Sequence, residues 1–342
     1  ISRLDLTNNK AYPYFFSDIA TDMYVRDLFM GITPGKILLW TDHGVKTLDY
    51  RNMTLQDTVV EMLNDSAAVN NVIRDSRENV WYCSYTGLFK QSAQTGEIKY
   101  FDLMDLPFAG TNSNSVTNLY ESRLHGLWII TDDGLFLYDY NSGQISRHGY
   151  DTEQGMVFPV QDINSVYETP DGICWVGTWQ GGLCRYNLES GEIKTFTTND
   201  GLPSMSIQGI LGDEKNSALW LSTFAGISRF SLEDEQFNNF SLKDGIQGLL
   251  YADGQYMKTS TGFFLFGGNN GLTWFNPDDF SDDSLPPTTY TTRFNVGDQS
   301  INIGPDFDGF NGISTLQDLT HVQNSISIEY TGIQYDDPLK NK

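Results

Sequence analysis

Apolar and polar residues alternate in four short runs between residues 162 and 197, and turn residues separate the runs. Val166 lies in the first run, and a Pro-Asp-Gly turn separates it from a second run around Trp175. A third run begins at Gly182, and a Ser-Gly turn leads to the fourth. Alternation with a period of two, bounded by Gly, Pro and Asp, is typical of antiparallel strands. This segment therefore predicts four strands joined by short turns.

The same pattern recurs along most of the chain. The glycines that open each third strand lie 43, 47, 48, 44 and 45 residues apart. They are Gly44, Gly87, Gly134, Gly182, Gly226 and Gly271. A tryptophan stands six or seven residues before four of them, at Trp81, Trp128, Trp175 and Trp220. A single four-stranded sheet cannot bury both of its apolar faces, so a period of about 45 residues predicts the blades of a β-propeller.

The predicted fold is all-β, with a seven-bladed β-propeller over residues 1–285 and the start of an Ig-like β-sandwich over residues 286–342. Six repeats are predicted near 24–56, 69–101, 114–148, 160–197, 205–241 and 253–280. Residues 1–16 match the third and fourth strands of a further blade, because Ile1-Ser2-Arg3-Leu4 aligns with Ile227-Ser228-Arg229-Phe230. We therefore expect an incomplete first blade, a sandwich that is cut short, and a sequence that is a piece of a longer protein.

Composition supports a large all-β protein and narrows its partners. Of the 342 residues, 39% are hydrophobic and 13% aromatic, which suits an aromatic core and argues against disorder. The net charge is −23, from 21 basic and 44 acidic residues. A field of that sign repels phosphate backbones, so we expect no nucleic acid partner for this chain. No apolar run approaches the roughly 20 residues of a membrane helix.

The cysteines and histidines do not form a recognisable metal or catalytic motif. Cys83, Cys174 and Cys184 make no Cys-x-x-Cys pair or Cys/His cluster, so we expect no zinc site. Cys174 and Cys184 flank the loop around Trp179, and two alternatives stay open for them: a disulfide across two strands, or buried free thiols. The histidine spacings do not match a metalloprotease, and there is no Gly-x-Ser-x-Gly elbow. We expect no catalytic residue, metal or cofactor.

We predict that the turns between the second and third strands form the ligand-binding face of the propeller. In a propeller these turns open around the axis on one face, together with the connections between blades. Aromatic rings bind the C–H face of a sugar, and Asp, Asn and Gln bind hydroxyls. The candidate residues are His43, Tyr85, Asp132, Trp179, Gln180, Phe224, Asn269 and Asn270. The alternative is that these side chains cap the blades, and we expect Arg185 and Arg229 to pair with carboxylates between blades.

The central unit resembles the propeller repeat of two-component regulators. The resemblance lies in Asp171-Gly172, Trp175-Val176-Gly177-Thr178, Gly181-Gly182-Leu183, Arg185-Tyr186 and Asp200-Gly201-Leu202-Pro203. The segment from Pro286-Pro287 to Lys340, with Asn324-Ser325-Ile326-Ser327-Ile328-Glu329-Tyr330, resembles the opening of the Tyr-rich Ig-like domain that follows such propellers. Together these segments are similar to the periplasmic sensor region of hybrid two-component systems, which in glycan-foraging bacteria detect oligosaccharides.

This resemblance implies a non-catalytic periplasmic region that senses an oligosaccharide or another small ligand. It implies a parent hybrid histidine kinase and response regulator, anchored in the inner membrane as a homodimer, that controls transcription through a phosphorelay. A one-component regulator with the same sensor is equally compatible. Two other classes stay open because a fold does not determine a function: a propeller glycan hydrolase or lyase, and a protein-interaction propeller.

Overall fold

The chain divides into two units, residues 1–278 and 279–342. The computed structural model describes residues 2–5, 10–13, 25–30, 36–41, 44–49, 51–52, 54–57, 69–106, 113–151, 155–280, 288–296, 299–301 and 325–333. Within these ranges the helices are short 3-10 turns, η2 (Thr198–Asp200), η3 (Leu242–Asp244) and η4 (Pro277–Asp279), and all other regular elements are strands. The predicted all-β class is confirmed. None of the described helices is long and apolar enough to cross a membrane.

Six successive antiparallel sheets make up most of the first unit. The first sheet comprises β3 (Val25–Met30), β4 (Lys36–Thr41), β5 (Gly44–Asp49) and β6 (Thr54–Asp57). The second comprises β7 (Val69–Arg74), β8 (Val80–Ser84), β9 (Gly87–Gln91) and β10 (Ile98–Phe101). The third comprises β11 (Val116–Glu121), β12 (Gly126–Thr131), β13 (Gly134–Asp139) and β14 (Ile145–His148). The fourth sheet comprises β17 (Ile163–Glu168), β18 (Ile173–Thr178), β19 (Leu183–Asn187) and β20 (Ile193–Phe196). The fifth comprises β21 (Ile207–Asp213), β22 (Ala218–Thr223), β23 (Gly226–Ser231) and β24 (Phe237–Phe240). The sixth comprises β25 (Tyr251–Lys258), β26 (Phe264–Gly268) and β27 (Gly271–Phe275).

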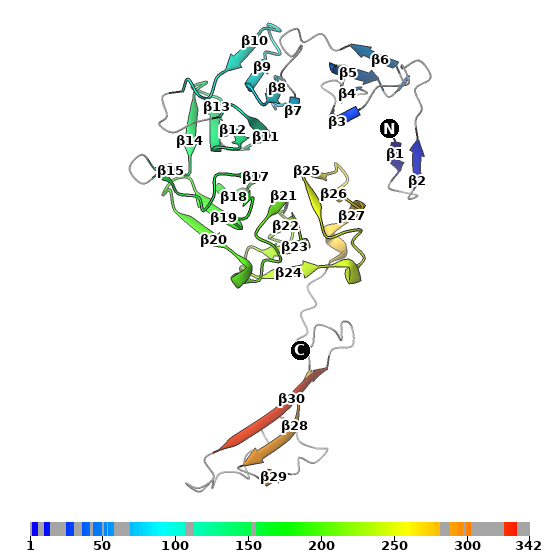
Figure 1. Cartoon of the computed structure of the whole chain (residues 1–342), viewed down its shortest axis with the longest axis vertical. Helices are drawn as coiled ribbons and strands as arrows, with labels where there is room; N and C mark the ends of the chain where they lie inside the picture. Colours follow the sequence, from blue (N-terminus) through cyan, green and yellow to red (C-terminus); the bar gives the residue numbers. More distant parts are fainter. Residues whose placement is uncertain are drawn as a thin grey trace. The chain divides into compact units, whose positions relative to one another are not determined.

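The sheets are arranged as the blades of a propeller. In each sheet the strands pair in chain order. The first strands contact one another in succession, β3 with β7, β7 with β11, β11 with β17, β17 with β21, and β21 with β25. Figure 1 shows these first strands nearest a common centre and the fourth strands, such as β14 and β20, on the outside. The described sheets therefore form a six-bladed arrangement.

Three features differ from the uniform predicted repeat. Among the described residues the last sheet has three strands, and β27 is followed by Asn276 and the turn η4. A small hairpin of β15 (Tyr150–Asp151) and β16 (Gly155–Met156) lies in the connection between two blades. The strands β1 (Ser2–Asp5) and β2 (Lys10–Pro13) form a two-stranded sheet, so a seventh blade stays a prediction.

The second unit contains a three-stranded antiparallel sheet. Its central strand β28 (Thr288–Val296) pairs with β29 (Gln299–Ile301) on one side and with β30 (Ile326–Ile333) on the other. Arg293 on β28 donates to Glu329 on β30 at 3.2 Å, an exposed pair across the sheet. An Ig-like identity for this unit stays a prediction.

The recurring tryptophans pack one blade against the next. Each of the four is 4% exposed or less. The Trp81 ring lies 4.8 Å from Tyr138 in the next sheet, and the Trp175 ring lies 5.2 Å from Phe230. Aromatic pairs at such distances contribute beyond the area that they bury. The sequence period therefore reflects a contact that recurs at successive blade interfaces.

The glycine that opens the third strand is required by its backbone conformation. Gly87, Gly134, Gly182, Gly226 and Gly271 all have positive φ, at 141°, 129°, 83°, 105° and 116°. A Cβ on Gly182 would lie 2.2 Å from the Phe196 carbonyl oxygen of the fourth strand. The turn before it is held by Thr178, whose Oγ1 donates to the Gly182 carbonyl at 2.8 Å. Each such turn is therefore a rigid position for the side chains that it carries.

The candidate disulfide between Cys174 and Cys184 is not formed. Both residues, and Cys83, are buried free cysteines. The register pairs Cys174 with Tyr186 and Cys184 with Val176, so the two sulfurs belong to different rungs of the ladder. Burial raises the pKa of Cys184 to about 11 and that of Cys174 well above its usual value. The buried-thiol alternative describes these residues.

His148 is expected to make stability depend on pH. Its Nδ1 lies 3.2 Å from the Tyr186 hydroxyl and its ring 5.1 Å from Trp128, and burial, with a smaller effect of His125, lowers its pKa to about 4. An unfolded histidine titrates near pH 6.5, so the unfolded state binds the proton first as the pH falls. Between pH 6.5 and 4 the free energy of unfolding should therefore drop by about 3 kcal/mol through this group.

Urea unfolding of the wild type and of His148→Gln at pH 7 and at pH 4.5 measures this contribution. The variant should lose less stability on acidification than the wild type does. Equal losses in the two proteins would show that His148 does not titrate differently on folding.

Candidate functional site

Seven of the eight predicted ligand-binding residues lie in described turns between second and third strands. Tyr85 follows β8, Asp132 follows β12, Trp179 and Gln180 follow β18, Phe224 follows β22, and Asn269 and Asn270 follow β26. His43, between β4 and β5, lies outside the described residues. Because strand order is the same in each sheet, these turns lie at equivalent ends of the blades.

A cavity of about 290 Å³ brings two of the predicted residues, Asp132 and Trp179, together. Its other lining residues come from the inner strands and their connections: Thr117, Asp162, Ile163, Asn164 and Asp253. These positions belong to three sheets, because Thr117 lies on β11, Asn164 on β17 and Asp253 on β25. The cavity is therefore built by convergence of blades that are distant in the sequence.

Trp179 is the aromatic group of this cavity, and the ring of Phe224 packs against its indole. The ring is 38% exposed and meets Phe224 edge to face, with centroids 5.0 Å apart and an interplanar angle of 89°. The Trp179 backbone N–H donates to the Asp162 carbonyl at 2.9 Å. Gln180 adopts a φ of 63°, and its N–H donates to Ser206 Oγ at 3.2 Å. The turn is thus fixed while part of the indole stays accessible.

Oxygen acceptors surround the cavity. Asp132 is exposed, and Asn164 is buried with its Nδ2 donating to the Ile207 carbonyl at 2.9 Å, which leaves its side-chain oxygen for another partner. Desolvation raises the pKa of Asp253 to about 6, opposed by the Gly254 N–H, although water reaches this carboxyl and screens its charge. The cavity can therefore accept several hydrogen bonds from hydroxyl groups beside an aromatic surface.

The other predicted residues lie away from this lining. Tyr85 is 59% exposed on a different blade. Phe224 supports the Trp179 ring. The Asn269 N–H donates to the Leu250 carbonyl at 3.1 Å, and Asn270 Nδ2 donates to the Gln247 carbonyl. Both asparagines therefore hold the connection that leads into β25.

The turn-based prediction omitted five lining residues: Thr117, Asp162, Ile163, Asn164 and Asp253. A signal for two of them is present in the sequence. A polar residue follows the buried Val or Ile that opens four first strands, in the pairs Val69-Asn70, Val116-Thr117, Ile163-Asn164 and Ile207-Gln208. At two of these positions, Asn70 and Asn164, the side-chain amide donates to the carbonyl of the residue that opens the next first strand. Asp253 belongs to the last sheet of the propeller, which lacks this pattern.

Across the described ranges there is no group of three or more His, Cys, Asp or Glu residues that could hold a metal ion.

Comparison with known proteins identifies the repeat. Residues 158–180 match the family model of the two component regulator propeller. Histidine kinase P4 of Formosa agariphila is 26% identical over 271 residues, which cover 75% of this chain and 19% of that protein. This chain therefore spans about a fifth of the length of that curated relative. The predicted resemblance to two-component regulator propellers is confirmed.

Two solved structures resemble this chain at low sequence identity. PorZ, a surface component of the type-IX secretion system of Porphyromonas gingivalis, matches with a TM-score of 0.53 and 14% identity, over 76% of this chain and 40% of its own. The extracellular domain of BT3049, a putative hybrid two component system of B. thetaiotaomicron, matches with a TM-score of 0.48 and 21% identity, over 91% of this chain and 47% of its own. The likeness to PorZ supports the propeller architecture alone.

Proposed function

We propose that this chain is a non-catalytic ligand-sensing region of a bacterial two-component regulator, and that the cavity at Trp179 binds an oligosaccharide. The observation that carries the proposal is the partly exposed Trp179 ring, held by Phe224 and surrounded by acceptor oxygens. A sugar offers a C–H face for the indole and hydroxyls for the carboxylates. The match to the regulator propeller repeat and the similarity to a histidine kinase support the sensing role.

The cavity also offers a way for binding to affect the fold. Its lining belongs to three sheets, so a ligand there contacts blades that can shift relative to one another. A ligand changes such an equilibrium only by binding one arrangement more tightly than another. In this proposal the chain is the periplasmic part of a membrane-anchored homodimer, and the shift is transmitted across the inner membrane to control transcription.

Replacement of Trp179 by Ala is expected to weaken oligosaccharide binding at least tenfold, about 1.4 kcal/mol. The aromatic surface is lost while the acceptor oxygens remain. Calorimetry of the wild type with a panel of oligosaccharides identifies a ligand, and the same titration on the variant measures the loss.

Tyr85→Ala is the matched control, because Tyr85 is an exposed turn aromatic outside the cavity. Its affinity should equal that of the wild type. Unchanged binding by Trp179→Ala would contradict the proposed site, and crosslinking to a protein partner without affinity for any sugar would favour an interaction propeller.

Asp253 is the observation that favours the hydrolase alternative. Desolvation raises the pKa of its carboxyl, and Asp132 and Asp162 line the same cavity, so a general acid and a second carboxylate are available there. Incubation with polysaccharides followed by product analysis separates the two functions. Products formed by the wild type but not by Asp253→Asn would establish an enzyme and overturn the sensing proposal.

A further inference from the structure

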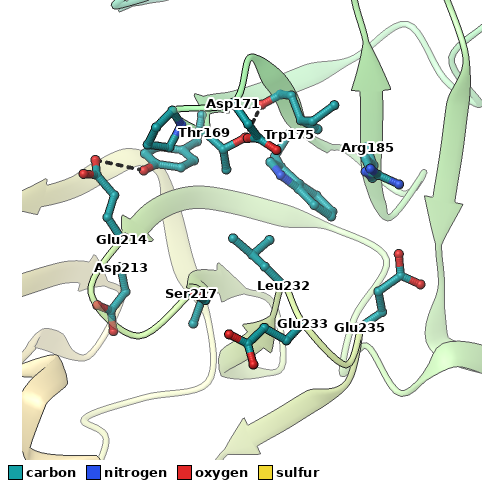
Figure 2. Close-up of a pocket in the computed structure, with 14 residues that line it drawn as sticks. Thr169, Asp171, Trp175, Arg185, Asp213, Glu214, Ser217, Leu232, Glu233 and Glu235 are labelled. Atoms are coloured by element: carbon teal, nitrogen blue, oxygen red, sulfur yellow. Dashed lines mark hydrogen bonds between the residues drawn. The ribbon is translucent and has the colours of Figure 1, made fainter.

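A larger cavity, of about 360 Å³, lies between the sheets β17–β20 and β21–β24. It is lined by the turns after β17, β21 and β23, and by Trp175 and Arg185. These turns are at the end of the blades opposite to the Trp179 turn, because antiparallel strands alternate in direction. Figure 2 shows Arg185 and Glu235 on one side of this cavity, with Trp175 and Leu232 near its middle.

Trp175 differs from the other recurring tryptophans in the bonding of its indole N–H. The other three donate to carboxylates: Trp81 to Asp75 at 2.7 Å, Trp128 to Glu168 at 3.1 Å and Trp220 to Asp213 at 3.4 Å. Among the described residues, Trp175 has no acceptor for this N–H, although it is only 4% exposed.

The sequence explains why this acceptor is missing. Asp75 stands six residues before Trp81, and Thr169 occupies the same position before Trp175. The Thr169 hydroxyl is already used, because it donates to the Ile173 carbonyl at 3.0 Å. The Trp175 N–H thus has no acceptor among the described residues, and a ligand in the cavity can supply one.

Three of the six charged side chains that line the cavity have no partner among the described residues. Contrary to expectation, Arg185 has no ion pair or hydrogen bond with any described residue, whereas the equivalent Lys90 lies over Trp81 and donates to the Tyr138 hydroxyl at 3.2 Å. Glu233 and Asp171 likewise have no partner in the described part of the chain. Glu235 pairs with Lys194. One cation and two carboxylates therefore face the cavity without a protein partner.

We propose that this cavity binds a short peptide through both of its charged ends. The terminal carboxylate pairs with Arg185, the ammonium pairs with Glu233 or Asp171, and a peptide carbonyl accepts from the Trp175 N–H. An apolar side chain packs on Leu232. A neutral or anionic ligand leaves the two carboxylates unpaired, and the volume lies within the roughly 300–1,000 Å³ of small-molecule pockets. This site is independent of the oligosaccharide proposal.

Titration of the ¹⁵N-Trp-labelled chain with the dipeptide Ala-Leu tests the proposal. The indole N–H resonance of Trp175, assigned with Trp175→Phe, should shift, and those of Trp81 and Trp128, whose acceptors do not line the cavity, should stay. N-acetyl-Ala-Leu and Ala-Leu-amide should each bind at least tenfold more weakly, because each lacks one charge. Arg185→Gln should bind Ala-Leu and its amide equally, and Glu233→Gln should discriminate less against the acetylated form.

Glu189→Gln is the control, because Glu189 is exposed in the turn after β19 and does not line the cavity. It should behave as the wild type, and unshifted resonances of Trp81 and Trp128 verify that each variant is folded. The proposal is overturned if Trp175 does not respond to about 10 mM Ala-Leu, if the three forms bind equally, or if Arg185→Gln discriminates as the wild type does. A Trp175 shift produced by oligosaccharides but not by peptides would also overturn it.

Discussion

Replacement of Gly182 by Ala should lower the free energy of unfolding by about 3 kcal/mol or more. Gly182 has a φ of 83°, a conformation that costs any other residue about 1–2 kcal/mol. The added Cβ would also lie 2.2 Å from the Phe196 carbonyl oxygen, a main-chain atom within the same sheet. That oxygen cannot move without disturbing the pairing of β19 with β20. The strain and the clash therefore act together.

Gly191→Ala is the matched control within the same blade. Gly191 has a similar φ of 73°, but nothing lies within 4 Å of the position that an added Cβ would take. This variant should lose only the conformational part, about 1 kcal/mol. Urea unfolding followed by tryptophan fluorescence measures both variants. Equal losses would mean that the close approach of the third and fourth strands does not explain the recurring glycine.

Replacement of Trp220 by Ala should cost about 3–5 kcal/mol, the range for a large buried aromatic side chain. Trp220 is 1% exposed, and its ring lies 5.3 Å from Phe240 and 4.6 Å from Phe275. Phe275 belongs to the last sheet, so the variant loses packing within its own blade and against the next one. Amide hydrogen exchange should therefore accelerate in β26 and β27 as well as in β22.

Trp220→Phe should keep part of this stability, and Tyr85→Ala, at an exposed position, should change it by less than about 0.5 kcal/mol. Faster exchange confined to β21–β24 would show that the two blades are not coupled through this ring.

The propeller could be predicted because its repeated contacts demand particular residues. A positive φ demands Gly, as at Gly182, and a blade interface filled by rings favours a Trp, as at Trp81. The hairpin β15–β16 and the three-stranded last sheet were not predicted. Each occurs once along the described part of the chain and therefore leaves no period in the sequence.

The candidate site was predictable only in part, for a related reason. The turn positions follow from the repeat, and the structure brings Asp132 and Trp179 into one cavity. How much of the Trp179 ring stays accessible depends on Phe224, which is distant in the sequence and contacts the ring from the next sheet. The position of Arg185 opposite Trp175 on the ladder follows from strand spacing, but its missing ion pair depends on the next blade.

Asp253 connects the cavity at Trp179 to the route by which the chain leaves the propeller. It lies on the first strand of the last sheet, and β27 of that sheet runs through η4 to the start of the second unit at residue 279. A ligand that contacts Asp253 therefore contacts the sheet that is continuous in sequence with the second unit. In the proposed sensing function, this sheet is the one of the three lining sheets through which binding would reach the segment that follows the propeller.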